Sequence, residues 1–296
     1  MTNIGLIGIG AMGEPMGQTL LRAGFTLRIC AHHNRERVER LIALGAKEET
    51  TPAAVAAASD VVITMVPDAP QVEEVLFAPA GVASAMRENG VVVDMSTISP
   101  VASRSFHERL AARKLRMLDA PVSGGPARAK TGELTIMAGG DPEVFARCKP
   151  VLAALGKPTL VGPAGMGETF KLVNQIIISC IMVADVEGLV FAKKAGADIS
   201  LLREVLGTAT ASNYLLNTWL PKAWFEDHHK GGFALDLLRK DLRAALETAR
   251  SIGTPLSSSS LAYELYSAAA ANGHGSDDYS SVADVYERAA GTRVAE

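Results

Sequence analysis

Three polar side chains share one face of a strongly apolar segment in the middle of the chain. Lys171, Asn174 and Gln175 stand at positions i, i+3 and i+4, which fall on the same side of an α-helix. A lysine can donate a proton to an oxygen that gains negative charge, and neighbouring amides can orient it. Most helical lysines are only solvated, but the residues around this trio are apolar. The pattern therefore favours a functional lysine over a surface one.

A glycine-rich segment near the N-terminus has the spacing of a dinucleotide-binding loop. Gly8, Gly10 and Gly13 form the pattern GxGxxG between a buried-strand run and a helical pattern that begins at Glu14. In such a loop the first glycine permits a tight turn, the second lets a pyrophosphate approach the backbone, and the third allows close packing of helix on strand. The positions expected to contact the cofactor are Gly8, Ile9, Gly10, Ala11, Met12 and Gly13. The alternative is a glycine-rich turn that binds nothing.

The end of the second predicted strand should carry the group that reads the adenosine ribose, which is commonly an acid in NAD-binding proteins. Here the segment from Ala31 to Arg35 contains no acid. His32, His33 and Arg35 could instead surround a 2′-phosphate, because arginine forms charge-assisted bidentate bonds with phosphate. The competing interpretation is that Asn34 caps the next helix and Arg35 points into solvent. NADP is therefore favoured slightly over NAD.

A second loop, from Asp119 to Pro126, follows a predicted strand at the edge where open α/β sheets bind ligands. Ser123 and the amides of Gly124 and Gly125 could hold a small carboxylate, because successive backbone N–H groups form an anion-binding concavity. Gly124 would leave the main chain open to that ligand. A plain loop is the alternative.

Acidic and basic side chains also gather on one late helical segment. Asp236 and Lys240 stand four residues apart, with Asp241 beside them, on a helix with an apolar stripe. Such spacing fits an exposed ion pair, which contributes only a few tenths of a kcal/mol, and it fits a functional cluster equally well. Spacing alone leaves both interpretations open.

The composition is that of a folded globular protein without a basic surface for nucleic acid. The chain has 296 residues, 48% of them hydrophobic and 21% charged, and its 29 basic and 32 acidic side chains leave a formal charge of −3. Three cysteines without CxxC spacing indicate buried thiols in a reducing compartment, and no metal site is expected. No signal peptide is recognisable, and the apolar run 176–184 is about half the length that spans a bilayer. We therefore expect a cytoplasmic protein that binds neither membrane nor nucleic acid.

Strand-like and helix-like patterns alternate up to about residue 163. The β-branched runs lie at 4–9, 27–29, 61–66, 91–95, 117–118, 135–137 and 159–161. Helices between them have start signals at Thr51-Pro52 and Ser99-Pro100. This alternation predicts an α/β fold with a doubly wound, mostly parallel Rossmann sheet over 1–163. Strand signals then disappear, so we expect an all-helical domain over 164–296, joined to the first by a long helix at about 169–195.

Taken together, these segments resemble the β-hydroxyacid dehydrogenase family, which includes 3-hydroxyisobutyrate dehydrogenase. The likeness extends over essentially the whole chain and rests on four motifs in order, GLIGIGAMGEPM, DAPVSGG with GELTIMAGG downstream, GMGETFKLVNQ and KDL. It implies that Lys171 is the catalytic acid/base. The substrate-binding positions that it implies are Ser123, Gly124, Gly125, Asn174 and Gln175. The further cofactor contacts that it implies are Met65, Val66, Thr97, Phe233 and Lys240.

Two features of the likeness point to the tartronate semialdehyde reductase branch. Asn174-Gln175 replaces the Asn-Asn of many members, and the tail from Gly273 to Ser280 has the pattern of that branch. The resemblance implies hydride transfer between NAD(P)H and a small semialdehyde or β-hydroxyacid, with 3-hydroxyisobutyrate, succinic semialdehyde and glyoxylate as alternative substrates. It also implies a homodimer or homotetramer. A catalytically silent dinucleotide-binding module is the interpretation from another class.

Overall fold

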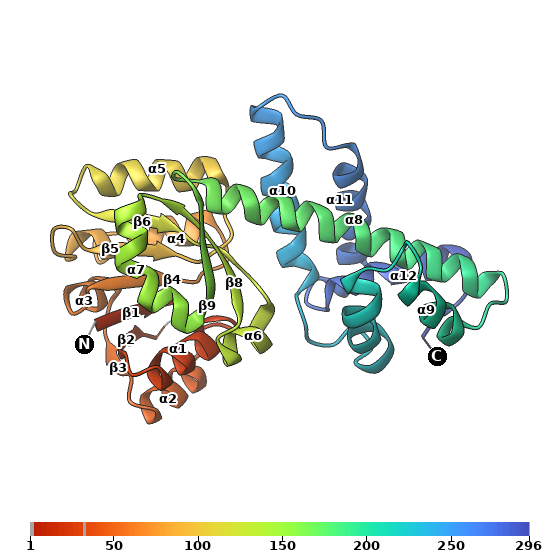
Figure 1. The fold of residues 1–296 in the computed structure, drawn as a ribbon, viewed down its shortest axis with the longest axis horizontal. Coiled ribbons are helices and arrows are strands. Elements are labelled where there is room, and N and C mark those ends of the chain that lie inside the picture. The colour runs from red at the N-terminus through yellow and green to blue at the C-terminus, as the bar shows by residue number, and fades with distance from the viewer. Residues whose placement is uncertain (1–2, 32–33, 296) are drawn as a thin grey trace. The chain divides into compact units, whose positions relative to one another are not determined.

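A computed structural model describes residues 3–31 and 34–295 (Figure 1). The chain divides into two compact units, Met1–Lys171 and Leu172–Glu296. This division falls within a helix rather than at the boundary after residue 163 that the sequence patterns indicate. That two separately folding domains meet after residue 163 stays a prediction.

The first unit contains a parallel sheet that antiparallel pairs extend at one edge. Its strands are β1 Asn3–Ile7, β2 Thr26–Cys30, β3 Lys47–Glu49, β4 Val61–Thr64, β5 Val91–Asp94, β6 Arg116–Asp119, β7 Val122–Ser123, β8 Leu134–Gly140 and β9 Gly156–Gly162. Neighbours pair in parallel along the order β3-β2-β1-β4-β5-β6, and β9 pairs in parallel with β8. β8 pairs antiparallel with β6 and β7. The doubly wound Rossmann sheet is confirmed, and each predicted apolar run corresponds to a strand.

Helices alternate with these strands, and two of their start signals were visible in the sequence. The bounds are α1 Gly13–Arg22, α2 Arg35–Ala43, α3 Pro52–Ala57, α4 Ala69–Phe77, α5 Pro100–Ala111, α6 Gly125–Thr131 and α7 Pro142–Leu155, with a short 3-10 turn at Val82–Ser84. Thr51 caps α3 by accepting the Ala54 N–H, and Ser99 caps α5 by accepting the Val101 N–H. Proline follows each cap in the first turn, where its missing N–H has no partner to lose.

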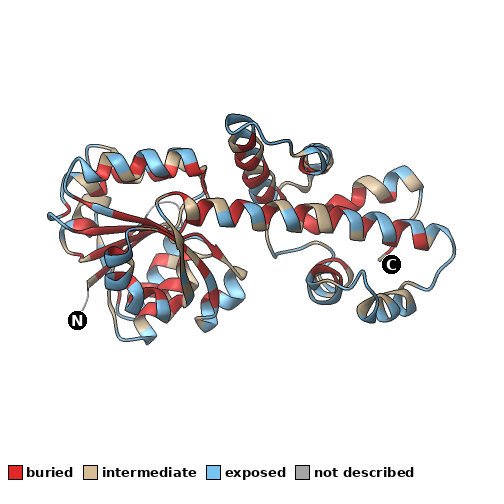
Figure 2. Ribbon diagram, turned by 45° about the horizontal axis from the view of Figure 1, so that its top comes forward, coloured by how far each residue is buried: buried red, intermediate tan, exposed pale blue. Residues whose placement is uncertain are grey.

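Successive residues of the central strands point into two different cores. Val61 and Ile63 of β4 belong to one buried apolar cluster, and Val62 between them belongs to another. β5 alternates in the same way. Because side chains alternate along a strand, a sheet buried on both faces has uninterrupted apolar strands. Figure 2 shows the buried residues running along these strands.

The regular structure of the second unit's described residues is helical. Helix α8, Met166–Lys194, begins in the first unit and continues through the second. It is followed by α9 Ile199–Thr208, α10 Leu235–Ser251, α11 Ser257–Ala269 and α12 Ala283–Ala290, with shorter helical turns at Leu215–Trp219, Pro221–Glu226, Ala270–His274 and Tyr279–Val282. This confirms the mostly helical C-terminal region and the long helix predicted at about 169–195, which runs from Met166 to Lys194.

Helix α8 supplies the centre of the second unit's core. Met182, Val186 and Leu189 are buried in one apolar cluster with Trp224 and Tyr266. Counted over its whole length, rather than over residues 176–184, α8 is long and apolar enough to cross a membrane. The core helix of a soluble protein passes the same test, and these buried contacts identify α8 as a core helix.

The cysteines differ in burial. Cys30 and Cys148 are buried, as expected, and burial raises the pKa of each thiol to about 11. Cys180 is only partly buried, contrary to expectation, because it lies at the margin of the second unit's core.

Candidate functional site

The GxGxxG loop has the geometry that each of its glycines requires. Gly8 follows β1 with φ +100°, and a Cβ there would overlap the carbonyl oxygen of Met65. A Cβ at Gly13, where α1 begins, would overlap the Gly8 carbonyl oxygen. At Gly10, in contrast, a Cβ would meet nothing within 4 Å. The backbone is therefore open where a pyrophosphate should approach, beside a helix N-terminus that favours negative charge, so the loop fits a dinucleotide.

Further predicted cofactor positions lie at the same edge of the sheet. The Met65 N–H, just after β4, donates to the Ile7 carbonyl at 2.9 Å. The Val66 N–H donates to the Ser96 hydroxyl at 3.0 Å, which brings in the loop after β5 that carries Thr97. The chain order reverses between the neighbours β1 and β4, and open α/β sheets bind ligands at such a point. The structure thus brings together Gly8–Gly13, Met65, Val66 and Thr97.

The end of β2 is the predicted ribose-reading position. Asn34 caps α2, as one of the two interpretations expected, by accepting a backbone N–H at 3.1 Å. Arg35 donates to Glu39 at 3.1 Å and to Glu48 at 2.5 Å, and its side chain is 55% exposed. A phosphate at this position would compete with these two carboxylates. The two histidines predicted here lie outside the described residues, and they are His32 and His33.

The Ser123 loop is open at Gly125 rather than at Gly124. Gly124 has φ +131°, and a Cβ there would lie 2.8 Å from the Arg128 side chain. Gly125 has φ +67°, and a Cβ there would meet nothing within 4 Å. The three residues join the end of β7 to the start of α6, so their amides follow one another through a tight turn. The loop can hold a small anion, and Gly124 is required for its backbone conformation.

A buried carboxylate holds the first turn of α8. Asp119, the last residue of β6, is fully buried and accepts the N–H groups of Gly165 at 2.8 Å and Glu168 at 3.1 Å. The His107 Nε2 lies 3.1 Å from the same carboxylate. The same turn contains Gly167, where only glycine fits because a Cβ there would overlap backbone oxygens of β6 and β8. An acceptor at this place satisfies N–H groups that have no partner inside the helix. Helix α8 therefore starts at a fixed place on the sheet.

Lys171 lies one turn further along α8. The Glu168 carboxylate accepts the Ile98 N–H at 3.1 Å, which ties this turn to the loop that carries Thr97. Lys171 is only 8% exposed. A lysine on an anchored turn, at the edge of the sheet where the strands end, can deliver a proton to one defined position. The sequence analysis assigned no role to Asp119 or Glu168. The one signal for them was their place inside the motifs DAPVSGG and GMGETFKLVNQ.

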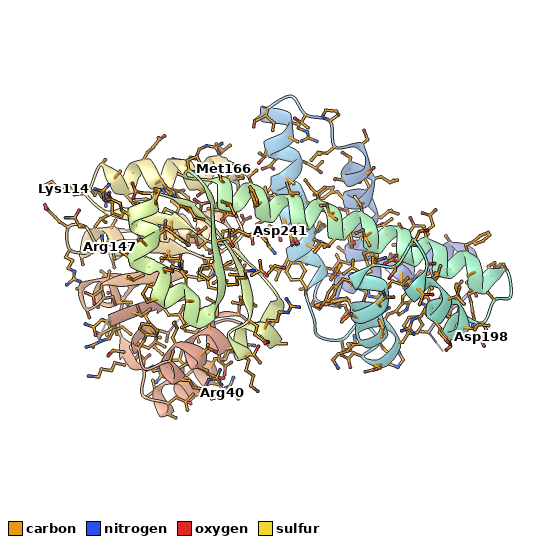
Figure 3. The ribbon with its side chains drawn as sticks, viewed as in Figure 1. Arg40, Lys114, Arg147, Met166, Asp198 and Asp241 are labelled. Atoms are coloured by element: carbon orange, nitrogen blue, oxygen red, sulfur yellow. The ribbon has the colours of Figure 1, made fainter. Side chains whose placement is uncertain are left out.

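In the second unit, two hydrogen bonds and one ion pair join four polar side chains that the sequence singled out. The Asn174 amide donates to the Gln175 side-chain oxygen at 2.9 Å, and the Gln175 amide donates to Asp241 at 2.7 Å. The Lys240 Nζ lies 2.8 Å from the other oxygen of Asp241, which is labelled in Figure 3. Gln175 and Asp241 are 1% and 2% exposed, so these bonds form in a low-dielectric interior. Lys240 thus belongs to a buried cluster rather than to an exposed ion pair.

Phe233 is held by a separate set of contacts in the second unit. Asp278 accepts the N–H groups of Phe233 at 2.9 Å and of Ser280 at 2.9 Å, and the Trp219 indole N–H at 3.1 Å. Burial raises the pKa of the Asp278 carboxyl, although these donors oppose the rise. The Phe233 ring lies edge-on to Tyr279, with centroids 6.0 Å apart. The tail segment that the sequence singled out therefore fixes the loop that carries Phe233.

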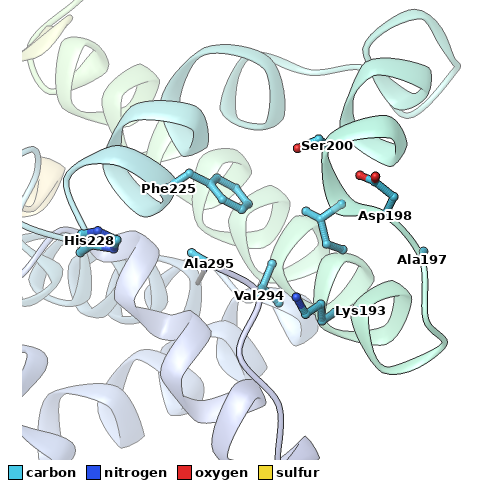
Figure 4. A pocket seen from close by; sticks show the side chains of 9 residues that line it. Lys193, Ala197, Asp198, Ser200, Phe225, His228, Val294 and Ala295 are labelled. Carbon is cyan, nitrogen blue, oxygen red and sulfur yellow. The ribbon is translucent and has the colours of Figure 1, made fainter.

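A cavity of about 320 Å³ lies elsewhere in the second unit (Figure 4). Its walls come from the end of α8, the start of α9, the segment at and just after the helical turn Pro221–Glu226, and the C-terminal segment; they include Lys193, Ser200 and His228. Asp198, also in the wall, caps α9 by accepting the Leu201 N–H at 3.0 Å. Within the described ranges, none of the predicted site residues lines this cavity.

Comparisons with known proteins decide the family. The NAD binding domain of 6-phosphogluconate dehydrogenase matches residues 3–173, and the NAD-binding region of NADP-dependent 3-hydroxyisobutyrate dehydrogenase matches residues 165–286. The 2-hydroxy-3-oxopropionate reductase of Escherichia coli is 40% identical over 293 residues, which cover 99% of each chain. The chain belongs to the β-hydroxyacid dehydrogenase family.

Other members of the β-hydroxyacid dehydrogenase family are similar over the same length. The 2-(hydroxymethyl)glutarate dehydrogenase of Eubacterium barkeri is 37% identical over 98% of this chain and 97% of its own. The Mycobacterium tuberculosis 3-hydroxyisobutyrate dehydrogenase, solved with L-serine, has a TM-score of 0.88 at 30% identity and covers 96% of this chain and 99% of its own. The chain is accordingly an NAD(P)-dependent dehydrogenase or reductase that acts on hydroxyl groups.

Proposed function

We propose that the protein uses NAD(P)H to reduce a small semialdehyde that bears a carboxylate, and that this substrate is tartronate semialdehyde (2-hydroxy-3-oxopropanoate). The observation that carries the proposal is the placement of Lys171. It is 8% exposed on a turn that Asp119 and Glu168 anchor to the sheet edge where the GxGxxG loop lies. The relative that is 40% identical bears the name 2-hydroxy-3-oxopropionate reductase, which supports the choice of substrate.

Each residue has a defined task in this reaction. NAD(P)H, when bound, supplies a hydride to the carbonyl carbon. Lys171 donates a proton from Nζ to the carbonyl oxygen as negative charge develops there. The Ser123 hydroxyl and the amides of Gly124 and Gly125 hold the substrate carboxylate and thereby orient the carbonyl group. Asn174 and Gln175, on the same face of α8 as the lysine, orient the substrate. The residues that would hold the cofactor are Gly8–Gly13, His32, His33, Arg35, Met65, Val66, Thr97, Phe233 and Lys240.

The cofactor in this proposal is NADP in preference to NAD. Ala31, at the end of β2, has no side-chain group that could bond the ribose hydroxyls, and Arg35 lies four residues beyond it. The ion pairs of Arg35 are formed by a solvent-exposed guanidinium, where such pairs contribute little to stability, so a 2′-phosphate can replace them. The test compares kcat/KM for NADPH and NADH in the wild type and in Arg35→Ala. A preference for NADH, together with unchanged NADPH use in the variant, would reverse the assignment.

Replacing the lysine tests the reaction itself. Lys171→Ala should lower kcat by about 100-fold to 10,000-fold, the range for a lost general acid, while the Kd for NADPH stays the same. Lys194→Ala, in the last turn of the same helix, is the matched control and should keep wild-type kcat. The assay follows NADPH or NADH oxidation with tartronate semialdehyde, succinic semialdehyde and glyoxylate. If no substrate is reduced although the cofactor binds, a catalytically silent binding module becomes the better description.

We also propose that the protein is a cytoplasmic homodimer or homotetramer whose ligand is a small carboxylate, without a nucleic-acid or membrane partner. Large apolar side chains on one face of α8 support a subunit interface, since Val173, Ile177 and Phe191 are 49%, 50% and 74% exposed. Light scattering during gel filtration should give the mass of two or four chains. The mass of one chain at micromolar concentration would contradict this.

A further inference from the structure

A basic hollow lies on one face of α10. Asp236, Arg239, Lys240 and Arg243 stand at i, i+3, i+4 and i+7 and therefore share that face. Together with Tyr263 of α11 they line a cavity of about 190 Å³. Its lining thus carries three cations and one carboxylate, an excess of positive charge in a protein whose formal charge is −3.

The ion pairs of these cations differ in strength. Arg239 lies 2.9 Å from Asp236, with side chains that are 36% and 52% exposed, and such an exposed pair contributes little. An anion that is a better acceptor can therefore replace Asp236 as the partner of the Arg239 guanidinium. The Lys240 ammonium lies 2.8 Å from Asp241, with side chains that are 14% and 3% exposed. That buried pair holds the Lys240 ammonium in place at the cavity.

The cations also repel one another along the helix. Arg239 and Arg243 are four residues apart, and Lys240 and Arg243 are three apart, and like charges at these spacings destabilise a helix. An anion among them would replace repulsion by attraction. Arginine presents a planar fork of N–H donors that matches two oxygens of a carboxylate or phosphate, and the Tyr263 hydroxyl can donate a further bond.

We propose that this cavity is a binding site for one oxyanion group, a carboxylate or a phosphate, of a small ligand. The proposal concerns residues of the second unit alone; it shares Lys240 with the cofactor contacts proposed above, but it does not depend on which substrate is reduced. Lys240 connects the cavity to Gln175 through Asp241. An anion that attracts the Lys240 ammonium therefore also changes the surroundings of a residue in the proposed substrate site.

Calorimetric titration of the full-length protein at low ionic strength tests the site. The probes are inorganic phosphate, malonate, NADP⁺ and NAD⁺, each added separately. Arg239→Gln and Arg243→Gln each remove one charged fork and should weaken binding of phosphate and malonate by about tenfold. Arg250→Gln, in the last turn of the same helix and outside the cavity, is the matched control and should bind like the wild type. Circular dichroism confirms that each variant is folded.

The probes separate the possible sources of the anion. Weaker binding of phosphate and malonate in the two cavity variants, with NADP⁺ unaffected, supports a site for a free anion or an organic acid. Weaker binding of NADP⁺ but not of NAD⁺ supports the same site with a cofactor phosphate as occupant. If the variant that combines Arg239→Gln with Arg243→Gln binds all four probes as the wild type does, or if Arg250→Gln weakens binding equally, the cavity is not an oxyanion site. Semialdehyde reduction by the Lys171 variants does not enter this comparison, so the two proposals can fail separately.

Discussion

Replacing Asp119 by asparagine tests whether the start of α8 sets the position of Lys171. The carboxylate accepts the N–H groups of Gly165 and Glu168 through different oxygens and lies beside His107. Asparagine has the same shape but only one acceptor oxygen, so its amino group would face a donor. Because Asp119 is fully buried, water cannot satisfy the N–H group that loses its partner.

The expected size of the effect follows from these contacts. A buried donor without a partner costs about 1 to 3 kcal/mol, so Asp119→Asn should lower the free energy of unfolding by about 2 kcal/mol. A catalytic group displaced by about 1 Å can lose about 100-fold in rate. We therefore expect kcat to fall by about 10-fold to 100-fold. The KM for NADPH should hardly change, because the GxGxxG loop follows β1 and is held by β4.

Asp141 offers a control with the same capping chemistry. It caps α7 by accepting the N–H groups of Glu143 at 2.8 Å and Val144 at 3.1 Å. Loss of such a cap costs about 0.5 to 2 kcal/mol, so Asp141→Ala should lower stability by a comparable amount without affecting α8. Thermal unfolding followed by circular dichroism gives the stabilities, and steady-state NADPH oxidation gives kcat and KM.

Two results would refute the reasoning about Asp119. Wild-type kcat in a destabilised Asp119→Asn would mean that Lys171 keeps its position without the carboxylate. An equal loss of kcat in Asp141→Ala would mean that general destabilisation, and not the start of α8, lowers the rate.

Three further predictions concern the nucleotide loop and two partly buried titratable groups. Gly10→Ala should keep the wild-type melting temperature but bind NADPH about tenfold more weakly, whereas Gly13→Ala should melt earlier because its Cβ overlaps a backbone oxygen; equal melting temperatures in the two variants would contradict this. Burial lowers the pKa of His229 from 6.5 to about 4, so the unfolded state binds more protons between these values and stability falls as pH drops through them, by up to about 3 kcal/mol. Urea unfolding of His229→Gln should show a smaller fall, and an identical one would count against the burial of this imidazole. Burial raises the pKa of Asp185 from 3.8 to about 6, so its ionisation reduces stability as pH rises through this range. The stability of Asp185→Asn relative to the wild type should therefore be greater at pH 8 than at pH 3. Urea unfolding at both pH values measures this difference, and an equal relative stability at the two would contradict the prediction.

Features with a local signal could be predicted from the sequence. The GxGxxG loop is an example, because the positive φ of Gly8 is a property of its own backbone and the close contact of Gly13 is with Gly8, a few positions earlier. The central strands are another, since burial on both faces makes each an apolar run. Two short strands gave no such signal: β3 is the charged segment Lys47–Glu49, and β7 is only Val122–Ser123.

Contacts between distant segments could not be predicted. Asp119 lies 46 and 49 residues from the N–H groups that it accepts, and Gln175 lies 66 residues from Asp241. Helical spacing shows which side chains share a face, but not what that face meets. For the same reason the sequence could not decide between an exposed and a buried role for Lys240, and it gave a ligand-based reason for Gly124 where the backbone conformation already requires glycine.

The Asp119 carboxylate also constrains the order of folding. The first turn of α8 has its N–H partners on β6, and Gly167 rests against backbone oxygens of β6 and β8. Joining these segments closes a long loop, whose entropy must be lost before the contacts form. The turn that carries Lys171 should therefore become ordered only after this edge of the sheet has assembled. A refolding chain that has formed its helices but not the antiparallel strand pairs would not hold Lys171 where it can donate a proton. Enzymatic activity would therefore be the last property to return.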